Sequence, residues 1–203
     1  MKKIQEKRDI EFFYEIGQLR LINRMWRRFF QSETSNVAEH TLRVIWIALA
    51  IAKKEGVKDE EKVLKMALVH DITESRTGEV DYISRQYADL KEELAIRDML
   101  ESTVLEEDFL KVWKEYEKRE SIEAKLVKDA DNLDVNLELM EQRIQTISDK
   151  FIKPREVLVK PKLYTETAKK YWSLIAKSDV HDWHVLGRNR FNQGDWKKVK
   201  KKK

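Results

Sequence analysis

Apolar side chains recur at helical spacing along almost the whole chain, and few residues interrupt that pattern. The 203 residues include only 5 glycines and 2 prolines, too few for a β protein rich in turns, and 41% of them are hydrophobic, too many for a disordered chain. The sequence therefore predicts an all-α helical bundle. Its length is typical of one domain, which we expect to span residues 1–195.

The spacing predicts helices over residues 8–22, 37–55, 60–73, 88–103, 107–118, 121–149 and 163–177. The first of them carries a broad apolar face that includes Ile10, Phe13 and Leu21. Gly56 is expected to end the second helix, and Asp59 to cap the third.

After the predicted helix 121–149, the helical spacing of apolar side chains is weaker. Pro154 is expected in the connection that precedes the last predicted helix. The closing stretch 181–188 is expected to lie over the bundle as a short helix. Trp183 should pack there, so His181 and His184 have a structural interpretation.

Charge and composition limit the classes of partner. The segment 196–203 holds six lysines, against a net charge of +4 for the whole chain, and we expect a disordered basic tail. No nucleic-acid partner is expected, because no aromatic platform accompanies the lysines. Without cysteine, a metal must be held by histidine and carboxylate. No apolar run reaches the roughly 18 residues of a membrane span, so we expect no membrane partner and a cytoplasmic location.

Three groups that can bind a metal or move a proton stand together in the segment Leu68–Glu74. His70 and Asp71 are neighbours, about 100° apart on a regular helix, but the backbone at a helix end can relax enough for both to reach one ion. Glu74 follows His70 by four residues and lies on the same side. The segment looks like half of a metal site.

Two further residues are the strongest candidates for the missing ligands. His40 lies in the first turn of the preceding buried helix, and Asp131 falls at the border of the buried stripe of the predicted helix 121–149. Each feature taken alone also fits an ordinary structural role. His40 would be a histidine at the edge of the core, and Asp131 a solvated helix charge.

The joint pattern resembles the H...HD...D signature of the HD-domain metal-dependent phosphohydrolases, with His40, then His70 and Asp71, then Asp131. Within that superfamily the chain looks most like the bacterial and archaeal 5'-deoxynucleotidases. The segments Leu21–Arg24 and Arg76–Gly78 match as well, so that the resemblance extends over most of the chain. It implies an all-α HD-domain helical bundle.

The resemblance also implies that His40, His70, Asp71 and Asp131 hold one divalent metal. Two imidazoles with two carboxylates suit Mn, Co, Fe, Ni or Zn better than Mg, and Co and Mn are the usual activators in the family. The metal would lower the pKa of a bound water and polarise the phosphate of a nucleoside 5'-monophosphate. Glu74 would position or deprotonate that water.

The expected substrate contacts follow the family with two departures. Arg24 matches the family's phosphate-binding arginine, whose planar guanidinium suits phosphate oxygens. In the family a tryptophan near the sugar follows directly, whereas here Met25 follows and Trp26 comes one place later. An Asp that contacts the deoxyribose 3'-hydroxyl and assists catalysis is replaced by Glu79, with Asp81 as the alternative.

We therefore expect a 5'-deoxynucleotidase, and a homodimer, for which the apolar segment 163–177 is either an interface or part of the core. One alternative is a triphosphohydrolase or a phosphodiesterase with the same metal ligands. A triphosphate needs several basic residues, and beside Arg24 only Arg76 and Lys128 are candidates. Another alternative is a non-catalytic metal-binding or nucleotide-binding protein, which the intact ligand set and Glu74 argue against.

Overall fold

The computed structural model describes residues 2–30, 32–143 and 148–185. The helices in these ranges are α1 (Lys2–Ile16), η1 (Gly17–Leu21), α2 (Arg27–Phe30), α3 (Val37–Glu55), α4 (Glu60–Val69), α5 (Glu74–Thr77), η2 (Ser84–Tyr87), α6 (Glu92–Leu100), α7 (Glu106–Lys118), α8 (Ile122–Arg143), α9 (Asp149–Leu158), η3 (Lys160–Lys162), α10 (Glu166–Ile175) and α11 (Asp182–Val185). The described residues form no strand, and the all-α prediction is confirmed.

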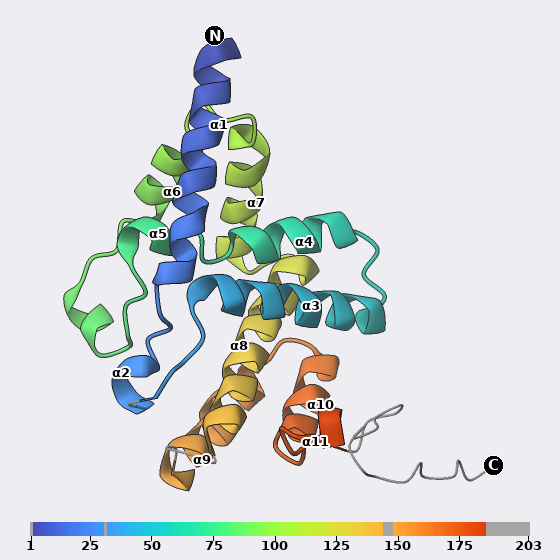
Figure 1. Cartoon of the computed structure of the whole chain (residues 1–203). Coiled ribbons are helices and arrows are strands. Elements are labelled where there is room, and N and C mark those ends of the chain that lie inside the picture. Colours follow the sequence, from blue (N-terminus) through green and yellow to red (C-terminus); the bar gives the residue numbers. More distant parts are fainter. Residues whose placement is uncertain (1, 31, 144–147, 186–203) are drawn as a thin grey trace, which may run out of the picture.

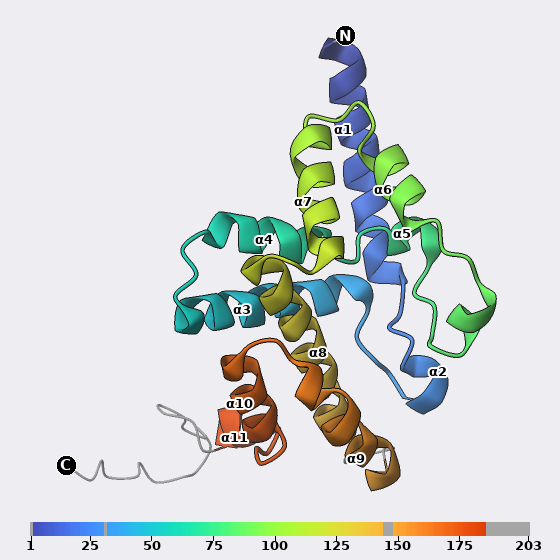
Figure 2. The same ribbon diagram turned by 180° about the vertical axis from the view of Figure 1, so that it is seen from behind.

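Three helices organise the molecule. α3 and α4 lie side by side across its middle, and the long α8 packs against both, as the two opposite views show (Figures 1 and 2). α1, α6 and α7 lie toward one end, where the Asp9 carboxylate accepts a hydrogen bond from the Val104 amide at 2.8 Å. α9 and α10 lie toward the other end, beside the second half of α8.

The main core lies where α3, α4 and α8 meet. Val44, Ile51, Met66 and Leu126 are fully buried there, and Leu133 is 1% exposed. Burial of one such side chain stabilises the fold by about 1.5–3 kcal/mol. These contacts fix α3, the turn after α4 and α8 relative to one another, and all four predicted metal ligands lie on those three elements.

A second apolar cluster joins the segment before α3 to the second half of α8. It consists of Trp26, Phe30, Val135, Leu139 and Met140. The Trp26 and Phe30 rings stack with centroids 5.7 Å apart. This cluster supports the wall of the cavity described below.

α3 has the bounds that its sequence predicts. The Asn36 side chain accepts a hydrogen bond from the Glu39 amide, and the Glu39 side chain accepts one from the Asn36 amide, which makes a capping box. Gly56 ends the helix in the left-handed conformation with φ 71°. Asp59 caps α4 as expected, accepting a hydrogen bond from the Lys62 amide.

α4 ends at Val69 and not at the predicted residue 73. The backbone hydrogen bonds that follow join residues three apart, from the Ile72 amide to the Val69 carbonyl at 3.5 Å and from the Glu74 amide to the Asp71 carbonyl at 3.1 Å. This tighter turn takes Asp71 out of the regular helix and brings its carboxylate to the side of the His70 ring.

The predicted apolar face of the first helix is only partly correct. Phe12 and Leu19 are buried, whereas Ile10, Phe13 and Leu21 are 52%, 59% and 66% exposed. The helix itself begins earlier than predicted and gives way to the 3₁₀ turn η1. α1 projects beyond α3 and α4, so that only one side of it meets the rest of the bundle (Figure 1).

α9 is a helix that the sequence analysis does not predict as a separate element. Pro154 lies inside it and removes one backbone donor. Phe151 and Ile152 pack against the second apolar cluster, and the Glu156 carboxylate accepts a hydrogen bond from Trp172 Nε1 at 2.5 Å. These tertiary contacts outweigh the local cost of the proline.

The end of the described chain differs from expectation. Trp183 in α11 is 70% exposed, so the prediction that it packs into the bundle is wrong. His181 and His184 are exposed as well. The expected basic tail 196–203 lies outside the described residues.

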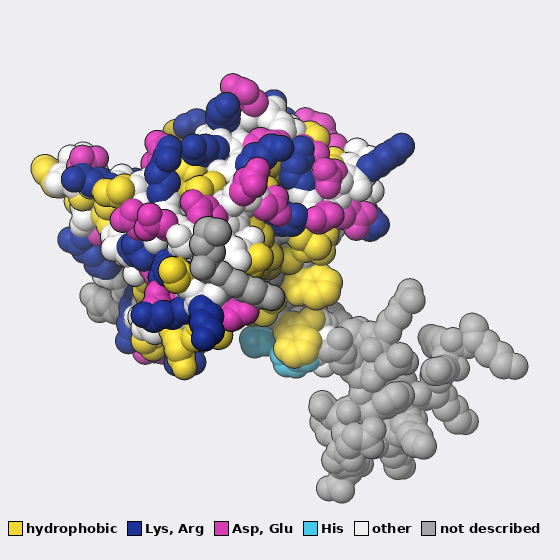
Figure 3. All heavy atoms as spheres, turned by 90° about the horizontal axis from the view of Figure 1, so that it is seen from above, with side chains coloured by type: hydrophobic (Ala, Val, Ile, Leu, Met, Phe, Trp, Pro, Cys, Tyr) yellow, Lys and Arg dark blue, Asp and Glu magenta, His cyan; other side chains and the backbone are white. Residues whose placement is uncertain are grey.

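No described helix is both long and apolar enough to cross a membrane. Seen from above, the described surface carries acidic and basic side chains interleaved over much of its area (Figure 3).

Candidate metal centre and active site

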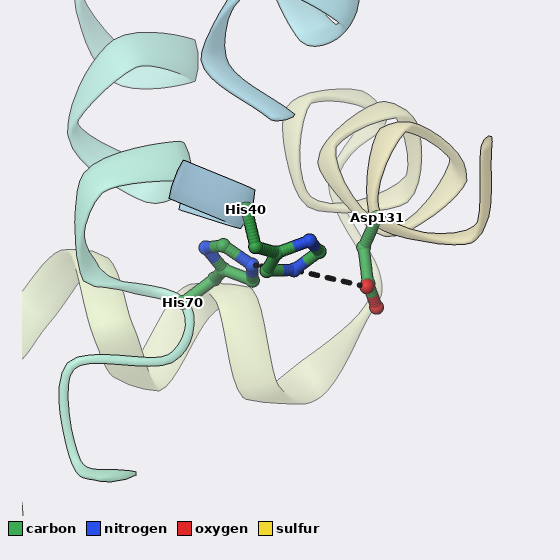
Figure 4. Close-up of side chains that lie close together, drawn as sticks. All are labelled: His40, His70 and Asp131. Carbon is green, nitrogen blue, oxygen red and sulfur yellow. Dashed lines mark hydrogen bonds and ion pairs between the residues drawn. The ribbon is translucent and has the colours of Figure 1, made fainter. Parts of the chain in front are cut away.

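The four predicted metal ligands come from three elements and converge on one point. His40 lies in the first turns of α3, His70 and Asp71 lie in the turn after α4, and Asp131 lies in the middle of α8. Figure 4 shows His40 between His70 and Asp131. The structure thus brings together residues that are far apart in the sequence.

The distances between ligand atoms are short. His40 Nε2 lies 3.3 Å from His70 Nε2, 3.4 Å from Asp71 Oδ2 and 3.4 Å from Asp131 Oδ1. Asp71 Oδ2 also lies 3.3 Å from His70 Nε2. Ligand atoms of His40, His70 and Asp131 all lie within 4.8 Å of one another, and all three residues are buried.

Both imidazoles present the same ring nitrogen to this point. His70 Nδ1 lies 2.8 Å from the Ala67 carbonyl oxygen, which assigns its proton to Nδ1. His40 Nδ1 lies 2.5 Å from Asp134 Oδ2. In each ring Nε2 is therefore the atom available to a metal.

The charges around this point favour a cation. Burial alone would raise the pKa of Asp71, but His70 and His40 hold it well below its usual range. Burial likewise opposes ionisation of Asp131, yet Lys128 and His40 hold the pKa of Asp131 well below its usual range. Burial and Arg24 oppose the protonation of His40, but hydrogen bonds with neighbouring carboxylates raise its pKa well above the usual value. A metal ion held by His40 Nε2 would take the place of that proton.

Glu74 lies beside the predicted ligands and, unlike Asp71 and Asp131, has a raised pKa. Burial and the neighbouring Asp71 and Glu79 carboxylates raise the pKa of Glu74 to about 11. Its Oε2 is buried without a hydrogen-bond partner. A buried carboxyl oxygen with no partner costs free energy unless a ligand or water supplies one.

The donor set fits a transition metal. Two imidazoles and two carboxylates suit Mn, Co, Fe, Ni or Zn, whereas Mg prefers oxygen ligands alone. Glu74 lines the same cavity as Asp71 and Asp131, and its unpartnered Oε2 could accept a hydrogen bond from a water bound there. The residues present therefore fit a divalent cation with Glu74 next to it.

Arg24 lies next to the same acids and is only 5% exposed. Its Nη1 donates to Glu79 Oε2 at 2.7 Å and to Asp71 Oδ2 at 3.3 Å. Although burial lowers the pKa of Arg24, these carboxylates raise it above its usual value, so the guanidinium stays charged. The Arg24 amide donates to the Ser35 carbonyl at 3.0 Å, which fixes Arg24 beside the start of α3.

The two candidate acids after Thr77 have separate places. Glu79 lines the cavity above the ligands and pairs with Arg24. Asp81 lies 2.5 Å from Arg28 Nη1 and accepts hydrogen bonds from the Ser84 side chain and amide. Glu79 is thus the acid at the site, and Asp81 anchors the loop that carries it.

A cavity of about 600 Å³ opens over these residues. Its size is in the range of small-molecule sites. Arg24, Asp71, Glu74, Glu79 and Asp131 lie together in its lining. Trp26 also lines it but is only 3% exposed, because most of its ring packs on Phe30 and Phe151.

No functional role is predicted from the sequence for α9, which forms part of the cavity wall with Lys150, Phe151 and Arg155. The Arg155 guanidinium lies 5.7 Å from the Trp26 ring centroid, and its Nε is buried without a hydrogen-bond partner. Phe151, Arg155 and Leu158 recur at helical spacing, a signal that Pro154 obscures. Of the two further basic candidates, Lys128 lines the cavity, whereas Arg76 is paired with Glu15 of α1.

Comparison with known proteins gives consistent matches. The family model described as HD domain matches residues 16–172. The chain is 33% identical over 143 residues to 5'-deoxynucleotidase HDDC2 of Danio rerio, across 65% of this chain and 68% of the relative. It is 32% identical over 146 residues to 5'-deoxynucleotidase yfbR of Photorhabdus temperata, across 64% of this chain and 73% of the relative.

The fold is also similar to solved structures. A conserved hypothetical protein from Pyrococcus furiosus superposes with a TM-score of 0.66 and 26% sequence identity. The match covers 83% of this chain and 99% of that one. The similarity therefore extends well beyond the segments that carry the predicted metal ligands.

Proposed function

The chain belongs to the HD domain family, and on that premise we propose that it is a metal-dependent 5'-deoxynucleotidase, which hydrolyses deoxyribonucleoside 5'-monophosphates to nucleoside and phosphate. The observation that carries the proposal is the arrangement at the base of the cavity. Two imidazoles and two carboxylates converge there, with an arginine and a protonated glutamate directly beside them.

His40, His70, Asp71 and Asp131 hold the divalent metal in this proposal. A bound metal supplies Lewis acidity, which polarises the phosphate and makes a neighbouring water more acidic. Arg24 binds phosphate oxygens and balances the charge that develops on them. Because Arg24 pairs with Glu79 in the absence of substrate, phosphate competes with that carboxylate for the guanidinium.

In this proposal Glu74 transfers a proton from the attacking water to the leaving group. It gives up its own proton when the cation binds, and its carboxylate then takes a proton from the attacking water. The new bond forms between that water oxygen and phosphorus, and the bond from phosphorus to the 5' oxygen breaks. Glu74 returns the proton to the leaving 5' oxygen, so the products are a nucleoside and inorganic phosphate.

The charges near the ligands favour a monophosphate. Arg24 is the arginine that contacts the ligand cluster directly, and Lys128 is occupied by Asp131, with Nζ 2.5 Å from Oδ2. Lys150 and Arg155 lie on the α9 wall of the same cavity. Binding of further phosphates by these two residues would make the substrate a triphosphate. The experiment below therefore compares monophosphates with triphosphates.

Selectivity for the deoxy sugar is part of the proposal. Glu79 contacts the sugar 3'-hydroxyl from its place beside Arg24. Trp26 lines the cavity with the small part of its side chain that is exposed, and it would limit the space beside the sugar. Both residues depart from the family pattern, so ribonucleotides are the informative comparison.

The proposal also includes Mn or Co as the physiological metal, a cytoplasmic location and a homodimer. Support for the dimer comes from an apolar surface groove where α3 meets α8 and α10. Its lining includes Trp46, which is 67% exposed, and Leu174, which is 52% exposed. Ala168 and Trp172 of the predicted segment 163–177 are buried in the core. In this proposal the exposed Leu174 of the same segment contributes to the dimer interface.

The test is phosphate release from dNMPs, NMPs, dNTPs and a bis-p-nitrophenyl phosphodiester, after removal of metal with EDTA and addition of Mn²⁺ or Co²⁺. We expect release from dNMPs only with metal, and slower release from NMPs. Turnover of triphosphates or diesters instead would change the substrate class. Bound metal without any turnover would indicate a binding protein.

A further inference from the structure

Asp134 is a fully buried carboxylate that touches a predicted metal ligand without reaching the ligand cluster. It lies three residues after Asp131 on α8 and is 0% exposed. Its Oδ2 lies 2.5 Å from His40 Nδ1, on the side of the ring opposite to the atom that faces Asp71 and Asp131. A carboxylate in this position accepts the Nδ1 proton and leaves Nε2 free for a metal.

The other oxygen of Asp134 is also occupied. Arg43 Nε donates a hydrogen bond to Oδ1. Arg43 Nη1 in turn donates to Glu141 Oε1 at 2.6 Å. Asp134 is thus held between two donors, on His40 and Arg43. An amide in its place would have to turn its NH₂ group toward one of them.

His70 provides an internal comparison. Its Nδ1 is held by the Ala67 carbonyl, a neutral backbone group. Only His40 is backed by a carboxylate, which both orients the ring and makes Nε2 a stronger electron donor. Resting on the metal site of the proposed function, we propose that Asp134 is a positioning residue for that site, which fixes the orientation and tautomer of His40 and strengthens its bond to the metal.

The experiment measures Co²⁺ binding by the full chain, with and without the Asp134→Asn substitution. The affinity comes from titration against a chelating dye, and the visible absorption band of bound Co²⁺ reports the ligand geometry. We expect the affinity to fall by about 10–100-fold, as for other outer partners of metal-bound histidines, and the band to change.

Asp129→Asn is the matched control. Asp129 is also a 0% exposed carboxylate of α8, but it accepts hydrogen bonds from the Tyr164 amide and from Thr165, in the connection before α10. We expect this variant to unfold at a lower temperature and to bind Co²⁺ with unchanged affinity and spectrum. A purely structural role for Asp134 would make the two variants behave alike.

A second variant covers the case in which Asp134→Asn does not fold. The double substitution D134N/R43Q lets the new amide oxygen face His40 Nδ1 while its NH₂ group donates to the glutamine. It keeps a hydrogen bond to His40 and removes the negative charge, so weaker Co²⁺ binding is expected relative to R43Q alone. Equal affinity and identical spectra in both comparisons would overturn the inference. Failure of the unsubstituted protein to bind Co²⁺ would instead overturn the metal site itself.

Discussion

Glu74→Gln should separate metal binding from turnover. Burial and the neighbouring Asp71 and Glu79 raise the pKa of Glu74 to about 11, so the side chain carries a proton at pH 7 in the metal-free protein. That value is about four units above pH 7, and at about 1.36 kcal/mol per unit its ionisation costs about 5 kcal/mol. In the proposed function, binding of the cation would supply this free energy. Glutamine has the same shape and no proton to lose.

We expect three properties of the Glu74→Gln variant to follow from the loss of this ionisable group. Turnover of dNMPs should fall by about 10²–10⁴-fold, the usual contribution of a positioned general base. Co²⁺ affinity should stay the same or rise, because no carboxyl group has to be ionised. The number of protons released on Co²⁺ binding at pH 7 should fall by about one, the single proton that Glu74 holds.

The assays are phosphate release at saturating Co²⁺ and calorimetric titration in buffers with different ionisation enthalpies. Glu123→Gln is the control, since Glu123 is a buried carboxylate of α8 that lies 3.1 Å from Lys62 Nζ, outside the cavity. It should leave turnover and proton release unchanged. If Glu74→Gln keeps turnover within threefold, or releases as many protons as the unsubstituted protein, the assigned role of Glu74 is wrong.

Asp71→Ala should lose Co²⁺ and turnover together, as measured by metal content after gel filtration and by phosphate release; metal retained at full stoichiometry would contradict its role as a ligand. Arg24→Ala should keep bound Co²⁺ and raise the KM for dNMP by about 10–100-fold, because a charge-assisted hydrogen bond is worth about 1.5–3 kcal/mol; an unchanged KM would exclude phosphate binding by Arg24. Burial alone would raise the pKa of Asp81, but hydrogen bonds from Ser84 and Arg28 hold this pKa well below its usual range. The Asp81 carboxylate therefore stabilises the folded state above its unfolded pKa of about 4, and this stabilisation is lost as the pH falls below that value. Asp81→Asn should therefore reduce the loss of stability between pH 5 and pH 3 in urea unfolding, and an unchanged pH dependence would refute the linkage. Trp46→Glu should turn a dimer into a monomer in light scattering without loss of bound Co²⁺, and a dimer that persists would move the interface elsewhere.

Sequence predicts the fold best where local signals agree. α3 has its predicted bounds because Gly56 adopts the left-handed conformation that ends a helix there. α9 is missed because Pro154 is a strong local signal against a helix, while the contacts that stabilise α9 come from Trp172 and the second apolar cluster. Contacts between distant segments leave no local pattern for sequence analysis to find.

In the candidate site, too, residues in a recognisable sequence pattern could be predicted, whereas a residue placed by contacts between distant segments could not. The spacing and identity of His40, His70, Asp71 and Asp131 suggest that they meet, and the structure brings them within a few ångströms of one another. Asp134 does not stand out in the sequence, since it is one of three acids within six residues of α8. Only the packing of α3 on α8 shows that its carboxylate faces His40 Nδ1.

The four proposed ligands of one ion are spread from residue 40 to residue 131, and the last of them lies on α8, which packs against both α3 and α4. A ribosome that has not yet released α8 therefore carries a chain without a complete metal site. An ion that binds only the finished fold stabilises it in proportion to the logarithm of its concentration over Kd. The supply of metal in the cell would thus raise the amount of completed protein and give no such protection to unfinished chains.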